Sequence, residues 1–200
     1  MKIESIKVGR RDKEKLVIRT ECGEYISACV DDAYALRVGD EITAERAEEL
    51  SARYSKTLAK KSAAKTLARR SMSEGELTRK LRDKGFSDTD TRDAVSWFAE
   101  HGFVDDEAYT DELVKYYTSR GYGKRRIKEE LYRRGISREL CERATDSLSD
   151  FTDEIRGLIE KKLHGEELTP DKKKKIVAFL IRRGFEYNEI KAAFGTEDFD

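Results

Sequence analysis

The sequence predicts a mainly α-helical protein in which three tandem three-helix repeats form an elongated, right-angled or solenoid-like array behind a small N-terminal β module. Three observations predict this fold. One motif recurs three times at nearly constant spacing, residues 1–43 hold short β-type runs, and charged residues make up 41% of the 200 residues against 38% that are hydrophobic. So small an apolar share must be spread over many short elements, which favours several small bundles over one large core.

The β module is expected at residues 1–43. Three short runs there, at 3–8, 16–20 and 25–30, hold β-branched or aromatic residues and are separated by GRRDKEK and ECGE, which are typical of turns. We therefore expect three short antiparallel strands. RVGDEIT ends the module, and the periodicity becomes helical from Ala44 onward.

Residues 44–70 carry two apolar stripes at helical spacing, which fits one long helix or two shorter ones. Lysines crowd the complementary side. A solvated helix face is the simpler interpretation, because lysine stems commonly cover helix surfaces. Lys60 and Lys65 from this side are kept as candidate contacts to a partner.

The strongest feature is the internal repeat. The segments LRDKGF, LYRRGI and LIRRGF align on Gly85, Gly135 and Gly184, which are 50 and 49 residues apart. Each copy has an apolar residue eight before the glycine, leucine four before, an apolar residue one after and alanine nine after. Apolar residues at −8 and −4 form a helical stripe, glycine takes the left-handed position after the helix end, and the next apolar residue folds back. Members of these four positions are Leu77, Ile127 and Ile176; Leu81, Leu131 and Leu180; Phe86, Ile136 and Phe185; and Ala94, Ala144 and Ala193.

Each copy thus holds a helix, a tight turn and a second helix, and the remaining length fits a third helix, at 107–120 and 151–164 in the later copies. Ser73 followed by Glu76 forms a capping box, and Thr169 before Pro170 marks another helix start. We place the repeats at 44–104, 105–149 and 150–200.

Composition and motifs exclude several protein classes. The first residues lack the apolar core of a signal peptide, and no stretch reaches the roughly 20 apolar residues of a membrane span, so a cytoplasmic protein without membrane contact is expected. The three cysteines show no CxxC spacing and are expected to be reduced thiols acting as small hydrophobes. Phosphate loops, nucleophile elbows and metal-ligand spacings are missing, so we expect no cofactor, no metal and no catalysis. Balanced charge, with 41 basic and 41 acidic residues, is compatible with a monomer.

The repeat motifs resemble a known family. SEGELTRKLRDKGF, FAEHGFVDDEAYTDELV and GYGKRRIKEELYRRGI followed by ERA are similar to the signature blocks of the RecX family, over about residues 60–195. The third copy matches more loosely, and the β module resembles an extension found in some members. The resemblance implies binding in the groove of the RecA nucleoprotein filament, which limits filament growth or promotes its loss and so lowers ATP hydrolysis and strand exchange. Single-stranded DNA is then contacted weakly or through RecA.

Two helix starts are candidate binding sites because they break an electrostatic rule. Helix N-termini carry partial positive charge and disfavour cations, yet one expected helix opens with Gly123 and three basic residues and another with four lysines. Free amides joined by cations would bind phosphate or carboxylate. Internal neutralisation by acidic stretches such as 105–112 and 150–154 is the alternative. The candidates are Lys124, Arg125, Arg126, Lys172, Lys173, Lys174 and Lys175. Reversing the first three to glutamate is expected to abolish RecA inhibition and leave melting unchanged.

Weaker candidates precede the repeat glycines. Arg133, Arg134, Arg182 and Arg183 lie at helix C-termini, where cations are ordinary dipole partners. Tyr122, between two glycines, could stack on a base.

Two other functions stay open. LYRRGISRELCERA is compatible with a direct nucleic-acid-binding protein built of helix-turn-helix-like units, and the chain could also be a helical scaffold for another protein. Steep salt dependence of tight binding to naked DNA would favour the former. The sequence does not distinguish capping of filament ends from lining of the filament groove.

Overall fold

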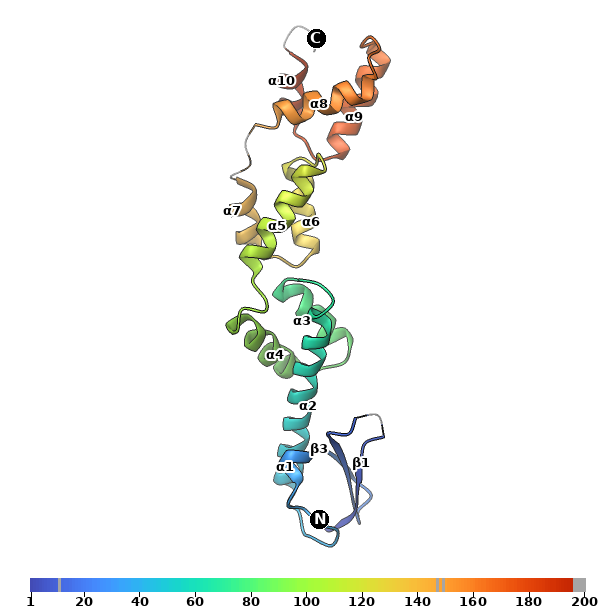
Figure 1. The fold of residues 1–200 in the computed structure, drawn as a ribbon, viewed down its shortest axis with the longest axis vertical. Coiled ribbons are helices and arrows are strands. Elements are labelled where there is room, and N and C mark those ends of the chain that lie inside the picture. Colours follow the sequence, from blue (N-terminus) through green and yellow to red (C-terminus); the bar gives the residue numbers. More distant parts are fainter. Residues whose placement is uncertain (11, 147, 149, 196–200) are drawn as a thin grey trace. The chain divides into compact units, whose positions relative to one another are not determined.

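The computed structural model describes residues 1–10, 12–146, 148 and 150–195 (Figure 1). It is mainly helical with one small sheet, as predicted. The chain divides into two compact units. The N-terminal unit holds Met1–Arg70 and Leu77–Phe103, and the C-terminal unit holds Ser71–Glu76 and Val104–Asp200. The elongated array expected from the sequence stays a prediction. Among the described residues, no helix combines the length and apolar character needed to cross a membrane.

The β module is a three-stranded antiparallel sheet in the order β1-β2-β3, and all three expected strands are confirmed. The strands are β1 (Ile3–Val8), β2 (Lys15–Thr20) and β3 (Tyr25–Cys29). Ile18 at the centre pairs with Ile6 on one side and Ile26 on the other, and Ile18 and Ile26 are buried. The third strand ends earlier than expected, because the short helix α1 (Val30–Ala33) begins directly after it with two aspartates in its first turn.

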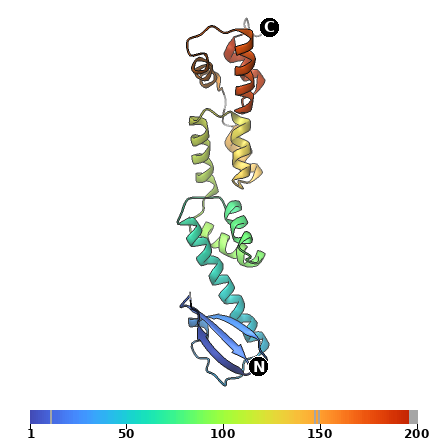
Figure 2. The same ribbon diagram turned by 90° about the vertical axis from the view of Figure 1, so that its right-hand side faces the viewer.

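A single helix, α2 (Ala44–Leu67), follows the sheet, which decides between the two arrangements that the periodicity allowed. Thr43 caps it, with the side-chain oxygen accepting the Arg46 amide at 3.2 Å. The first half packs on β3 (Figure 2). The second half packs on α4 (Asp88–Glu100), and Ala59 and Ala63 of this half are buried.

The three repeats are confirmed as helix pairs closed by the same turn. The pairs are α3 (Glu74–Asp83) with α4, α6 (Lys124–Arg133) with α7 (Arg138–Asp146), and α9 (Pro170–Arg182) with α10 (Tyr187–Phe194). The repeat glycines have φ of 86°, 78° and 89°. In each turn the residue after the glycine donates its amide to the carbonyl of the leucine that lies four residues before the glycine, at 3.2–3.3 Å. These hydrogen bonds and the left-handed glycine define a Schellman turn.

The expected additional helices are α5 (Asp106–Ser119) and α8 (Thr152–Leu163), each within one residue of the predicted bounds. The second repeat packs Tyr109, Leu113 and Tyr117 from α5 against Ile127 and Leu131 from α6. The tyrosines at 109 and 117 therefore belong to the core. Phe151 and Ile155 begin the matching core of the third repeat.

Two of the Schellman turns lie directly against the start of another helix within the C-terminal unit. A Cβ atom at Gly123 would stand 2.5 Å from the Gly184 carbonyl oxygen. A Cβ atom at Gly75 would stand 2.3 Å from the Gly135 carbonyl oxygen. These approaches exclude any side chain. We call the pairs Gly75/Gly135 and Gly123/Gly184 the glycine joints. The Ser73 hydroxyl completes the first joint by accepting the Glu76 amide at 3.0 Å and donating to the Arg134 carbonyl at 2.5 Å.

The cysteines differ in environment, since Cys22 is exposed, Cys29 half-buried and Cys141 fully buried. Only Cys141 fits the expectation of a small core hydrophobe. Burial raises the pKa of its thiol from 9.0 to about 11.

We expect Cys22 to react rapidly with a chromogenic disulfide reagent at pH 8 and Cys141 to react only in denaturant. Because the folded-state pKa of Cys141 is raised, its contribution to stability is complete below about pH 9 and is lost as the pH rises towards 11. Thiol titration with and without urea measures the first effect. For the effect on stability, the urea midpoint of the parent protein should fall between pH 9 and 11, and that of Cys141→Ala should fall less steeply. Equally steep falls for the two proteins would contradict this prediction.

Candidate functional site

A basic groove lies on α8 and α9 in the C-terminal unit. It encloses a cavity of about 350 Å³. Every charged residue that lines it is a cation. The lining residues, called here the α9 groove, are Lys162, Lys172, Lys175, Ile176, Phe179 and Arg182.

Helical spacing assembles most of this groove. Lys172, Lys175, Phe179 and Arg182 follow one another at intervals of three or four residues, which places them on one side of α9. Pro170 occupies the first helical turn, and the Thr169 side chain accepts the Lys172 amide at 3.4 Å, as the cap signal predicted. The cap and the proline fix where the helix begins and hence where its first lysines stand.

Cations surround the aromatic ring of the groove. The Lys162 ammonium lies 4.7 Å from the centroid of Phe179, and the Arg183 guanidinium lies 4.9 Å from it. Lys172 pairs with Glu166, and this hydrogen bond lowers the pKa of the Glu166 carboxyl. Lys175 and Arg182 are exposed. The groove therefore presents positive charge around an apolar floor, which suits an anionic ligand with planar or apolar parts.

Phe179 and Lys162 line the groove but were not predicted from the sequence as site residues. Phe179 shares the helical face of Lys172 and Lys175, so a helical projection of α9 would have found it. Lys162 comes from the last turn of α8 and joins the groove only because α8 packs on α9. No sequence pattern marks it.

The α6 start differs from expectation, because two of its amides already have partners within the chain. The Gly123 amide donates to the Arg183 carbonyl at 2.9 Å, and the Arg125 amide donates to the Gly184 carbonyl at 3.2 Å. The positive end of α6 thus meets the negative, carbonyl end of α9. A prediction of open amides considered α6 alone and is wrong for this reason.

The three cations at that start also have internal partners. Lys124 pairs with Asp146 at 2.9 Å, the Arg125 guanidinium donates to the Ile181 carbonyl at 2.9 Å, and Arg126 pairs with Glu130 at 2.7 Å. Internal pairing, the alternative considered from the sequence, describes these contacts, but the partners are Asp146, Glu130 and a backbone carbonyl and not the acidic stretches 105–112 and 150–154 that were expected. A partner-binding role for the three residues stays a prediction.

The cations that precede the repeat glycines serve different purposes. Arg133 pairs with Glu130 at 2.7 Å, and Arg134 donates to the Tyr109 hydroxyl at 3.1 Å. Arg183 donates to the carbonyls of Arg120 and Gly121 at 2.5 and 3.0 Å. Only Arg182 of this group lines the α9 groove.

The remaining candidates lie outside the α9 groove. The Tyr122 ring is half-buried between Tyr117, with centroids 5.8 Å apart, and the Arg183 guanidinium at 5.2 Å. Lys173 is half-buried and Lys174 is exposed on α9. Lys60 and Lys65 belong to α2 in the N-terminal unit.

Family models match all three repeats. They describe the first, second and third three-helix domains of RecX and match residues 59–98, 105–144 and 150–194. The chain belongs to the RecX family. Its α9 groove lies in the third RecX domain, and the Gly123/Gly184 joint connects the second and third.

Individual relatives agree with the family models. The Regulatory protein RecX of Caldanaerobacter subterraneus is 32% identical over 177 residues, covering 86% of this chain and 88% of the relative. That of Vibrio vulnificus is 31% identical over 140 residues, covering 69% and 92%. A crystal structure of regulatory protein RecX superposes with a TM-score of 0.68 at 16% identity, covering 96% of this chain and 98% of that one. The chain is thus a RecX-type regulatory protein with the RecX fold.

Proposed function

We propose that this chain is a negative modulator of the RecA recombinase, which binds the RecA–DNA filament and inhibits its growth, its ATPase and its strand exchange without catalysing a reaction of its own. Membership of the RecX family supports the partner. The α9 groove supports the surface, and its wholly cationic set of charged lining residues is the observation that carries the proposal. Phosphates of filament DNA, or carboxylates on RecA, are the ligands that such a groove suits.

The groove offers two modes of anion contact. Arg182 can bind a phosphate or carboxylate through two parallel N–H donors, whereas Lys175 acts as a mobile point charge. Phe179 supplies an apolar floor between them and Lys162. A chain held in this way on the filament would obstruct the addition of further RecA subunits.

The test is the ATPase of RecA on single-stranded DNA in the presence of substoichiometric protein. The double variant Lys175→Glu/Arg182→Glu should require at least about tenfold more protein for half inhibition, because two charge-assisted contacts become repulsive. Both side chains are exposed, so the thermal melt should not change. Strong inhibition far below stoichiometry by the parent protein would indicate capping of filament ends.

Lys7→Glu/Lys115→Glu is the matched control, because both lysines are exposed and lie outside the α9 groove. It changes the net charge equally and should inhibit as the parent does. Undiminished inhibition by the groove variant would contradict the assignment of the groove as the contact surface.

Direct binding of single-stranded nucleic acid is a second candidate, favoured by the aromatic Phe179 among the groove cations. Binding to naked oligonucleotide would then weaken steeply with salt, with a logarithmic slope of about −0.7 for each phosphate contacted. Lys175→Glu/Arg182→Glu should flatten this slope by about 1.4 if both cations contact phosphate. Tight naked-DNA binding without any effect on RecA would replace the first proposal by this one.

A further inference from the structure

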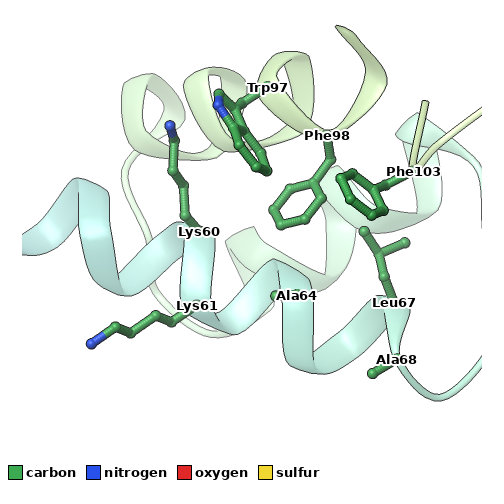
Figure 3. A pocket seen from close by; sticks show the side chains of 8 residues that line it. All are labelled: Lys60, Lys61, Ala64, Leu67, Ala68, Trp97, Phe98 and Phe103. Carbon is green, nitrogen blue, oxygen red and sulfur yellow. The ribbon is translucent and has the colours of Figure 1, made fainter. Parts of the chain in front are cut away.

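A second cavity lies in the N-terminal unit, between the C-terminal half of α2 and the end of α4 (Figure 3). Its volume is about 580 Å³. The lining residues, called here the α2–α4 groove, are Lys60, Lys61, Ala64, Leu67, Ala68, Trp97, Phe98 and Phe103.

Small residues on one helix and large ones on the other create this space. Ala64 and Ala68 are exposed and leave room beside α2, while Trp97 and Phe103 stack with ring centroids 6.2 Å apart. Phe103 is 63% exposed. In Figure 3 the Phe98 ring and the Leu67 side chain face the same space from α4 and α2, and Phe103 lies beside them. The exposed Phe103 ring and the open space beside Ala64 and Ala68 make this hollow a candidate site for an apolar group.

The charges at the groove have one sign. The Lys60 ammonium lies 4.7 Å from the centroid of the Trp97 ring, at one end of the groove. Lys61 points away from the aromatic rings in Figure 3 and pairs with Glu14. None of the described residues that line the groove carries a carboxylate. An occupant that fills the apolar space and brings a negative charge to Lys60 is therefore complementary.

We propose that the α2–α4 groove binds an acidic amphipathic segment of a protein partner, which inserts one or two large apolar side chains beside Phe103 and places a carboxylate at Lys60. Two helices with an apolar space between them form the usual receptor for such a segment. A nucleic acid fits less well, because the side chains of Ala64, Leu67 and Ala68 offer no hydrogen-bonding group to a base edge. The site goes beyond the proposed function, since it lies in the N-terminal unit and does not depend on RecA.

The sole tryptophan of the chain lines this groove, so its fluorescence reports occupancy. The probe is a short synthetic peptide with phenylalanine and leucine on one helical face and glutamate elsewhere, labelled for anisotropy. We expect saturable binding to the full-length protein with a shift in Trp97 emission. Phe103→Ala should weaken this binding about tenfold, and Lys60→Glu should weaken it several-fold. Tyr34→Ala, which removes a 74% exposed aromatic ring of the same unit, should have no effect.

Peptide variants and other ligands make the outcome decisive. A peptide with lysine in place of glutamate should bind the parent protein more weakly and Lys60→Glu more tightly. The proposal is overturned if the acidic peptide shows no saturable binding, or if the lysine peptide binds the parent equally well. It is also overturned if an oligodeoxynucleotide shifts Trp97 emission at lower concentration than the peptide, or if the protein self-associates through a contact that Phe103→Ala removes.

Discussion

Gly184→Ala is expected to destabilise the protein by at least about 3 kcal/mol, whereas Gly85→Ala should cost only about 1–2 kcal/mol. Both glycines have left-handed φ, of 89° and 86°, and both close the Schellman turn of a repeat. A Cβ atom at Gly85 would meet nothing within 4 Å, but one at Gly184 would stand 2.3 Å from the Arg126 amide nitrogen. The difference between the two variants therefore measures the Gly123/Gly184 joint.

Gly123→Ala separates the joint from backbone strain. Gly123 has φ of −82°, which any residue adopts, yet its Cβ atom would lie 2.5 Å from the Gly184 carbonyl oxygen. We expect a loss of about 2–3 kcal/mol, because the clash would break the two backbone hydrogen bonds between α6 and the turn after α9. Urea unfolding followed by circular dichroism measures all three variants. Equal midpoints for Gly184→Ala and Gly85→Ala would refute the joint.

The repeat could be predicted from sequence because its physics is local. Leu81, Leu131 and Leu180 are fully buried, and each accepts the hydrogen bond of the residue after its glycine. A helical stripe, a left-handed residue and an apolar residue that folds back fall within a dozen positions. Their order in the chain therefore specifies the turn in every copy.

The contacts between repeats could not be predicted in the same way. Gly75 and Gly135 meet although they lie 60 residues apart, and they occupy different positions within their repeats. A glycine that is required by the approach of another backbone has no local signature. Lys162 could not be predicted for the same reason, because it joins the α9 groove only through the packing of α8 on α9.

The cations at the start of α6 are a real anomaly, and the structure supplies a cause for it within the chain. Cations at the start of α6 are unfavourable for an isolated helix. Here the last carbonyls of α9 lie against that start, and the Arg125 guanidinium donates to one of them. The Arg125 side chain thus contributes to a joint between repeats, and a partner-binding role for the three cations stays a prediction.

Arg126→Glu is expected to lower the free energy of unfolding by about 3 kcal/mol, since it replaces the partner of a buried carboxylate by a like charge. The Glu130 side chain is only 10% exposed and lies 2.7 Å from the guanidinium nitrogens of both Arg126 and Arg133. Glu129 also pairs with Arg126, at 3.3 Å. The variant would place three carboxylates together, with Arg133 as the remaining cation.

Controls distinguish lost pairing from general charge effects. Lys174→Glu makes the same change of charge at an exposed position on α9 and should leave the urea midpoint within about 0.5 kcal/mol of the parent. Arg126→Gln should lie between the two, because it removes the pairing without adding repulsion.

The same contacts change how a reversal of Lys124, Arg125 and Arg126 must be interpreted. Unchanged melting was expected from the sequence, but pairing of Arg126 with the buried Glu130 predicts substantial unfolding. Loss of RecA inhibition in that triple variant would then report a damaged joint, whereas the loss in Lys175→Glu/Arg182→Glu would report a lost contact. A triple variant that melts like the parent protein would show that the carboxylates near α6 find other partners. The Gly123/Gly184 joint would then depend on its backbone hydrogen bonds alone.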